Sequence, residues 1–177
     1  RLYVVAGILL FYYACVMLIP VPGYGAGNLT FEGNLIGWID RTFLPGRLLQ
    51  GTYDELGIFT QLPALCLTVL GAFAGEILRN QSYQDRQKLI RLLVIGIVCI
   101  AIGLLWSLHF PIAKRLWSSS FILLTGGMAF ISMALFFAII DILQIKKWSF
   151  FFVVIGMNSL TIYMVYRFVN FRHTSRL

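Results

Sequence analysis

Charged side chains are scarce in this sequence. Its 177 residues include 14 Lys and Arg and 7 Asp and Glu, together 12% of the chain, whereas soluble domains carry about a quarter charged residues. Hydrophobic residues make up 59% of the chain, and its mean hydropathy is +0.85. This composition argues against a soluble globular protein and predicts a protein that resides in a lipid bilayer.

Cysteines are few, and the common catalytic motifs are missing. Cys15, Cys66 and Cys99 are odd in number, fall inside apolar runs and lack metal-ligand spacing, so we expect neither a metal site nor disulfides. The sequence contains no P-loop, no G-x-G-x-x-G motif and no recognisable Ser/His/Asp set. The residues alone therefore identify no catalytic group.

Five apolar runs are each long enough to cross a bilayer, which takes about 17–25 residues of helix. Because backbone polar groups cannot be left unpaired in hydrocarbon, each run can cross only as a helix. The predicted spans are residues 3–20, 59–78, 92–108, 120–140 and 150–168. The predicted fold class is therefore an all-α, polytopic transmembrane helical bundle. We expect residues 1–177 to form a single domain and to be a piece of a longer membrane protein.

Basic residues cluster in the loops Arg79–Arg91 and Gln144–Trp148, and this bias places both loops on the cytoplasmic side. The formal charge of +7 is then a topology signal, and we expect no nucleic-acid partner. The loops Val21–Ile58 and His109–Ser119 fall on the opposite side. A loop of almost forty residues is too long for a simple connector. We therefore predict that residues 21–58 form an ordered extracytoplasmic lid, with Trp38 at least partly buried.

Two features inside the spans invite interpretation. Gly71 and Gly75 form a G-x-x-x-G face, which we interpret as a packing surface for a neighbouring helix. Asn158, with Ser159 and Thr161 beside it, is the deepest strongly polar side chain and should face the bundle interior. A hydrogen bond to another helix and a ligand-binding role are equally compatible with its position.

One stretch goes beyond generic hydropathy. Residues 110–121 read FPIAKRLWSSSF, which resembles the F-P-I-N-K-x-L-W-T-S-S-F stretch of the transmembrane heparan-α-glucosaminide N-acetyltransferase family, including its bacterial members. Other segments resemble the family's motifs in the same order: Gly27-Asn28-Leu29 through Asn34 to Asp40-Arg41, then Asp54 and Gly57 through Pro63 to Gly71, and finally Gly156–Tyr163. The resemblance covers nearly all of the chain after the first span and corresponds to the C-terminal part of the family's membrane domain.

The resemblance implies a membrane-embedded acyltransferase. Such an enzyme moves acetyl from cytosolic acetyl-CoA, its co-substrate, to the amine of a terminal glucosamine on the outer or lumenal side. The residues that the resemblance and the topology assign to substrate binding are Asn34, Asp40, Arg41, Asp54, Lys114, Trp117, Asn158 and Tyr163. The cations assigned to the CoA phosphates are Arg79, Arg91, Lys146 and Lys147. We expect a multi-pass protein of a bacterial inner membrane.

The chain departs from the family pattern at several positions. The family's Pro and Glu after Asp54 are Glu55 and Leu56 here, and Ala113 replaces a common Asn. The family's catalytic histidine lies in an N-terminal segment absent from this chain, and neither His109 nor His173 sits in a matching motif. We therefore assign no catalytic residue and expect the fragment alone to be inactive.

Two other function classes remain open. A secondary transporter of a small polar solute would use the same kind of bundle, with Asn158 at a midplane substrate site. A non-catalytic membrane module, without the histidine because of divergence, is the third hypothesis. Whether the protein forms a homo-oligomer is left open by the sequence.

Overall fold

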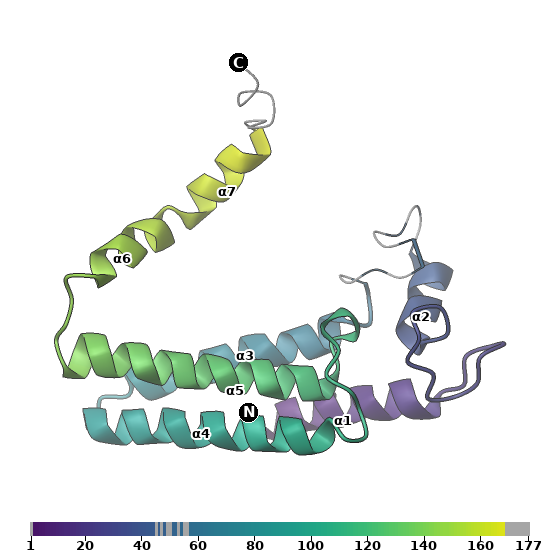
Figure 1. The fold of residues 1–177 in the computed structure, drawn as a ribbon, viewed down its shortest axis with the longest axis horizontal. Helices are drawn as coiled ribbons and strands as arrows, with labels where there is room; N and C mark the ends of the chain where they lie inside the picture. The colour runs from purple at the N-terminus through teal and green to yellow at the C-terminus, as the bar shows by residue number, and fades with distance from the viewer. Residues whose placement is uncertain are drawn as a thin grey trace. The chain divides into compact units, whose positions relative to one another are not determined.

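The chain is all-helical, which confirms the predicted fold class. The computed structural model describes residues 2–44, 46, 48, 51–52, 54 and 57–168, without the side chains of residues 162 and 166–168. The helices are α1 (Leu2–Leu18), α2 (Leu35–Phe43), α3 (Gln61–Arg79), α4 (Asp85–Trp106), α5 (Ser119–Phe137), α6 (Ser149–Met157) and α7 (Ser159–Phe168) (Figure 1). A 3-10 turn at Lys114–Leu116 precedes α5, and a π-helical turn at Ala138–Ile142 follows it. The described residues contain no strand.

Three helical segments are long and apolar enough to cross a membrane: α3, α4 and the continuous stretch Ser119–Ile142. The first helix, α1, is apolar but shorter, with 17 residues. At about 1.5 Å per residue, a helix such as α3 extends close to the roughly 30 Å thickness of the hydrocarbon core. The first four predicted spans thus fall on helices, as expected for a multi-pass membrane protein.

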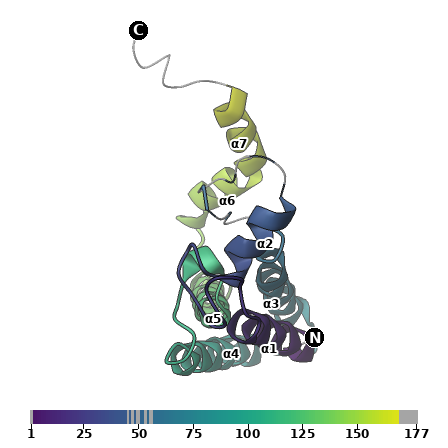
Figure 2. The ribbon, with the colours of Figure 1, turned by 90° about the vertical axis from the view of Figure 1, so that its right-hand side faces the viewer.

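The chain divides into two compact units, Arg1–Ala134 and Leu135–Leu177. In the first unit α1, α3, α4 and α5 run side by side, and α2 lies at one end of this bundle (Figures 1 and 2). At that end α1 and α4 finish while α3 and α5 begin. We call it the outer end, after the predicted topology, and we call the end with the α3–α4 turn the inner end.

Apolar side chains from all the long helices of the first unit fill its interior. Leu9 of α1, Cys66 of α3, Leu92 of α4 and Ile122 of α5 are at most 1% exposed and belong to one cluster. A second cluster at the outer end includes Tyr12. Because lipid tails are as apolar as these side chains, the helices are held together by close packing and hydrogen bonds rather than by exclusion of water.

Close packing is tightest between α4 and α5, where glycines let the two backbones meet. A Cβ atom added at Gly127 would lie 2.7 Å from the carbonyl oxygen of Gly96 and 2.9 Å from the backbone nitrogen of Ile100. A Cβ atom at Gly71 or Gly75 would meet no atom within 4 Å. No helix of the described residues therefore packs closely on the two glycines of the predicted G-x-x-x-G face, Gly71 lines a cavity between α3 and α5, and a close backbone approach occurs between α4 and α5 instead.

This packing gives a prediction for Gly127→Ala. The added methyl group would overlap backbone atoms of α4, which cannot move aside as a side-chain end can, so we expect a loss of about 1–3 kcal/mol of stability. The measurement is the thermal unfolding of the full chain in detergent micelles, with Gly71→Ala as the matched control in open space. Equal melting temperatures for the two variants would contradict the close approach.

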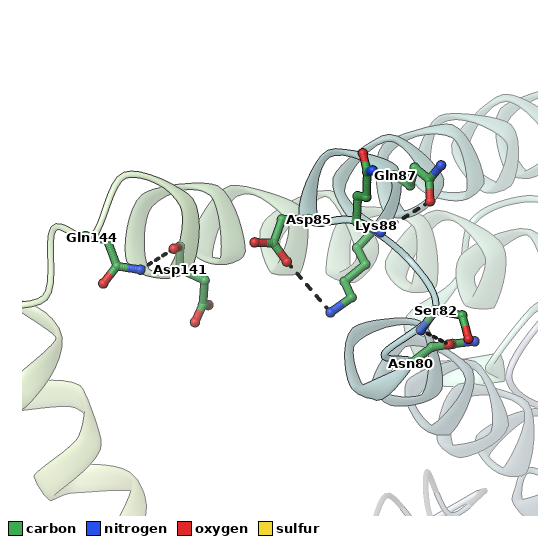
Figure 3. A network of polar contacts seen from close by, with 8 residues as sticks. Asn80, Ser82, Asp85, Gln87, Lys88, Asp141 and Gln144 are labelled. Carbon is green, nitrogen blue, oxygen red and sulfur yellow. Dashed lines mark hydrogen bonds and ion pairs between the residues drawn. The ribbon is translucent and has the colours of Figure 1, made fainter.

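The second unit differs from its prediction as a single span over 150–168. The segment forms two helices, α6 and α7, which meet at Asn158. Upstream, Gln144 adopts a left-handed backbone conformation with φ 56°, and its side-chain amide donates to the carbonyl oxygen of Asp141 (Figure 3). The ring of Trp148 packs edge-on against Phe152, with centroids 5.5 Å apart. The chain thus turns between the π-helical segment and α6.

Candidate functional site

Polar residues around α2 form a cap at the outer end of the first unit. Asn34 is fully buried and begins the helix, because its Oδ1 accepts a hydrogen bond from the Gly37 N–H at 2.6 Å. Its Nδ2 donates to the Thr30 carbonyl oxygen at 2.6 Å. Both sides of this amide are therefore used to join the preceding turn to α2, which is the ordinary role of Asn at a helix N-terminus.

Asp40 is fully buried on the side of α2 that meets the following loop. Its Oδ2 accepts a hydrogen bond from the Asp54 N–H at 3.2 Å. Its Oδ1 has no hydrogen-bond partner, and it is the only buried side-chain oxygen or nitrogen of the described residues in that state. A Cβ atom added at Gly57 would overlap both carboxylate oxygens, so Gly57 is packed directly against this group.

The environment of Asp40 raises the pKa of its carboxyl. Burial raises the pKa of this carboxyl, and the nearby Asp54 carboxylate raises the pKa further. Hydrogen bonds from the backbone of Asp54 and Ile58 and the charge of Arg41 lower the pKa, but burial prevails. A protonated carboxyl costs less to bury than a carboxylate, because no full charge has to leave water.

Arg41 holds the same loop from the neighbouring position. One terminal nitrogen of its guanidinium donates to the Thr52 carbonyl oxygen at 2.6 Å, and the other donates to the Glu32 carbonyl oxygen at 2.7 Å. Asp40 and Arg41 thus bind the segments before and after α2 to the helix. We use the name α2 cap for residues 28–43 together with Thr52, Asp54 and Gly57.

The α2 cap brings together four of the residues assigned to substrate binding, namely Asn34, Asp40, Arg41 and Asp54. Trp38 is half-buried. The described residues of the loop are therefore held together by their polar side chains, whereas an ordered lid over residues 21–58, some of which lie outside the described residues, stays a prediction. In this structure the side-chain contacts of Asn34, Asp40 and Arg41 are made to the cap's own backbone.

The loop before α5 is attached to the same end of the bundle. The Tyr12 hydroxyl donates to the Leu116 carbonyl oxygen at 2.7 Å, and the Ser119 hydroxyl donates to the Leu9 carbonyl oxygen at 2.8 Å. Both donors are fully buried. The Arg115 guanidinium lies over the ring of Phe31, 5.2 Å from its centroid, and so connects this loop to the α2 cap.

Two predicted substrate-binding residues lie in this loop. Trp117 is half-buried, has a left-handed backbone with φ 49° and packs edge-on against Phe121 at 6.3 Å. Lys114 begins the 3-10 turn and is exposed. Lys114 is thus an exposed cation at the outer end.

Asn158 and Tyr163 belong to the second unit. The Asn158 side-chain amide donates to the Val154 carbonyl oxygen at 2.7 Å, within its own segment, and Tyr163 is exposed on α7. We expected the Asn158 amide to pair with another helix or a ligand, but its donor is used locally. The Val154 carbonyl oxygen also accepts the Asn158 backbone N–H at 3.2 Å, so the side-chain amide adds a second hydrogen bond to the same acceptor.

The predicted CoA-binding cations occur in two places. Arg79 and Arg91 are exposed on either side of the α3–α4 turn, and Arg91 lies over the Tyr83 ring, 3.8 Å from its centroid. Lys146 and Lys147 are exposed between the π-helical turn and α6, in the second unit. The structure describes each pair within its own unit.

Sequence reasoning assigned no site role to Tyr12, Ser119 or Gly57, although Ser119 and Gly57 fall in the family-like segments. Tyr12 lies inside an apolar run, and its hydrogen-bond partner is 104 residues away, so nothing local indicates the contact. Gly57 has no positive φ that would explain a glycine. A glycine is needed at this position because the carboxylate beside it leaves no room for a Cβ atom. This contact exists only in the folded loop, so the sequence does not indicate it.

No family model matches the chain. The chain is 25% identical over 177 residues to the heparan-alpha-glucosaminide N-acetyltransferase of Homo sapiens, which covers 83% of this chain and 26% of the human protein. It is 25% identical over 181 residues to the protein of the same name from Mus musculus, covering 85% of this chain and 27% of the mouse protein. The chain thus spans about a quarter of the length of these curated relatives. These two relatives confirm the resemblance to the N-acetyltransferase family that the motifs indicated.

The contact between Gly57 and Asp40 gives a prediction for the α2 cap. Gly57→Ala would place a methyl group against both carboxylate oxygens, so we expect the loop after α2 to detach and cleavage by an added protease to rise at least about threefold, as for a loss of roughly 1 kcal/mol or more. The readout is limited proteolysis of the full chain in membranes. Gly7→Ala, where no atom lies within 4 Å of the new Cβ, is the matched control. Equal cleavage rates would refute the proposed packing.

Proposed function

We propose that this chain is part of a membrane-embedded acyltransferase that moves an acetyl group from cytosolic acetyl-CoA to the amine of a terminal glucosamine on the outer or lumenal side. The observation that carries the proposal is its similarity to two mammalian N-acetyltransferases over 83% and 85% of its length. The apolar helices of the first unit support it, because transfer between the two sides requires a protein that crosses the membrane.

The proposed reaction defines what the protein has to supply. The amine nitrogen attacks the thioester carbonyl carbon, the carbon–sulfur bond breaks, CoA leaves as its thiol, and the amine loses a proton to a base. Hydrogen-bond donors must stabilise the oxyanion, and cations must hold the CoA phosphates. We assign Arg79, Arg91, Lys146 and Lys147 to the phosphates and no residue of this chain to the base.

At the outer end we propose that some residues shape the α2 cap and others bind the acceptor. Asn34, Asp40, Arg41 and Asp54 give the α2 cap its shape, because the hydrogen bonds described above join them to groups of the cap itself. Lys114 is exposed and therefore available to orient the acceptor sugar, with Trp117 next to it as an aromatic surface on which a sugar ring can pack. Asn158 and Tyr163 are the candidates within the last apolar segment.

One observation favours a second candidate, a secondary transporter. Transporters often contain helices that break near the midplane, where free backbone groups and polar side chains bind the solute. The interruption between α6 and α7 at Asn158 has this character, with Ser159 donating to the Gly156 carbonyl oxygen at 2.9 Å beside it. The two candidates differ in whether a covalent bond is made.

The decisive experiment is an acetylation assay on the full-length protein in membrane vesicles. We expect acetyl-CoA added on the cytoplasmic side to yield N-acetylglucosamine on the other side, with one CoA thiol released per acetyl group transferred. Vesicles from cells without the protein are the control. Uptake of unmodified solute without release of CoA would instead support the transporter.

Asn158 provides a sharper test of the intramembrane site. If its amide contacts the thioester or the acceptor, Asn158→Ala should lower acetyl transfer at least about tenfold, which is about 1.4 kcal/mol in the barrier, at a nearly unchanged melting temperature. Ser159→Ala, which removes the adjacent hydrogen bond to Gly156 but leaves the amide, is the matched control. Near-normal acetyl transfer by the Asn158→Ala variant would show that this residue has only a structural role.

A further inference from the structure

The α3–α4 turn at the inner end has a defined shape. The side-chain oxygen of Asn80 accepts the Ser82 N–H at 2.9 Å, which closes the turn after α3. The Gln87 side chain accepts the Gln84 N–H at 3.2 Å as part of a capping box at the start of α4 (Figure 3). Side chains that project from this turn are therefore held in fixed relative positions rather than on a flexible tail.

Cationic side chains of this turn are exposed and outnumber the acids. Arg79, Arg86 and Arg91 are exposed, and Lys88 is half-buried. The acid between them, Asp85, lies 3.8 Å from the Lys88 ammonium and so is matched by that cation (Figure 3). Three arginines thus remain in excess over the acids of the segment 79–91.

Arg91 packs against an aromatic ring of the same turn. It is in the second turn of α4, and its guanidinium carbon lies over the Tyr83 ring, 3.8 Å from the centroid. Tyrosine is typical of the membrane–water interface, where its ring is apolar and its hydroxyl reaches water. A guanidinium over an aromatic ring still has N–H groups that can bind an anion. A cation held at that interface is level with lipid phosphate groups.

We propose that Arg79, Arg86 and Arg91 form a binding surface for the phosphate group of an anionic membrane phospholipid. Arginine suits this ligand because its planar donors match two phosphate oxygens at once. Juxtamembrane cations on the cytoplasmic side are attracted to the anionic leaflet in proportion to their number. The inference goes beyond acyl transfer, and it makes a membrane phospholipid, in place of CoA, the ligand of Arg79 and Arg91, which leaves Lys146 and Lys147 as the proposed cations for the CoA phosphates.

The test is native mass spectrometry of the full chain taken from nanodiscs that contain phosphatidylglycerol and phosphatidylcholine in equal amounts. We expect bound phosphatidylglycerol to exceed phosphatidylcholine by at least about fivefold, and the triple variant Arg79→Gln/Arg86→Gln/Arg91→Gln to retain the two lipids about equally. The matching Arg→Lys triple variant keeps the charge and should keep most of the preference. Lys114→Gln, at the outer end, should leave it unchanged.

Each outcome decides the proposal. Equal retention of the two lipids by the unmodified protein would overturn it, and so would a preference that survives the Arg→Gln variant while that variant keeps its melting temperature. A separate series with added CoA distinguishes the two phosphate sources. Loss of all bound phosphatidylglycerol at CoA concentrations that saturate the protein would assign these arginines to CoA instead. None of these results depends on acetyl transfer, so failure of the proposed function leaves the lipid test valid.

Discussion

Hydrogen bonds from buried hydroxyl groups to distant backbone carbonyls determine the outer end of the first unit. Tyr12 donates to Leu116, and Ser119 donates to Leu9, so each bond joins α1 to the segment that precedes or begins α5. A buried hydroxyl without a partner costs about 1–3 kcal/mol. Removing either acceptor would therefore cost more than the modest net gain of one hydrogen bond. The position of the 109–118 loop, and with it Lys114 and Trp117, depends on these contacts.

The α2 cap is also held by hydrogen bonds between side chains and backbone groups, and its residues resemble a functional motif. Asp40 and Arg41 are adjacent in sequence, and both form hydrogen bonds to the loop after α2. Asp40 accepts the Asp54 N–H, and Arg41 donates to the Thr52 carbonyl oxygen. A motif of this kind can be required for activity without touching the substrate, because it sets the shape of the surface that does.

The sequence was sufficient for the helical class and for most spans, because an apolar run of membrane length has one viable conformation. It was not sufficient for contacts between spans. Gly71 and Gly75 have the spacing of a packing face, but spacing alone does not say which helix is adjacent, and the close approach involves Gly96 and Gly127. The break at Asn158 was missed because an amide that bonds back to its own helix leaves no trace in hydropathy. For the site, the cap residues were identified from the motif, whereas their partners depended on the fold.

The sequence separations of these contacts also order the assembly of the protein. The bonds that close the α2 cap join residues 9 to 14 positions apart, whereas those that fix the 109–118 loop join residues 104 and 110 positions apart. Short loops close quickly and at low entropic cost, whereas a contact between distant residues can form only after both residues have been synthesised. During synthesis the cap can form once residue 57 has emerged, before α3, α4 and α5 are made. The α2 cap would then be in place before α5 inserts and the Ser119 hydroxyl reaches the Leu9 carbonyl oxygen of α1.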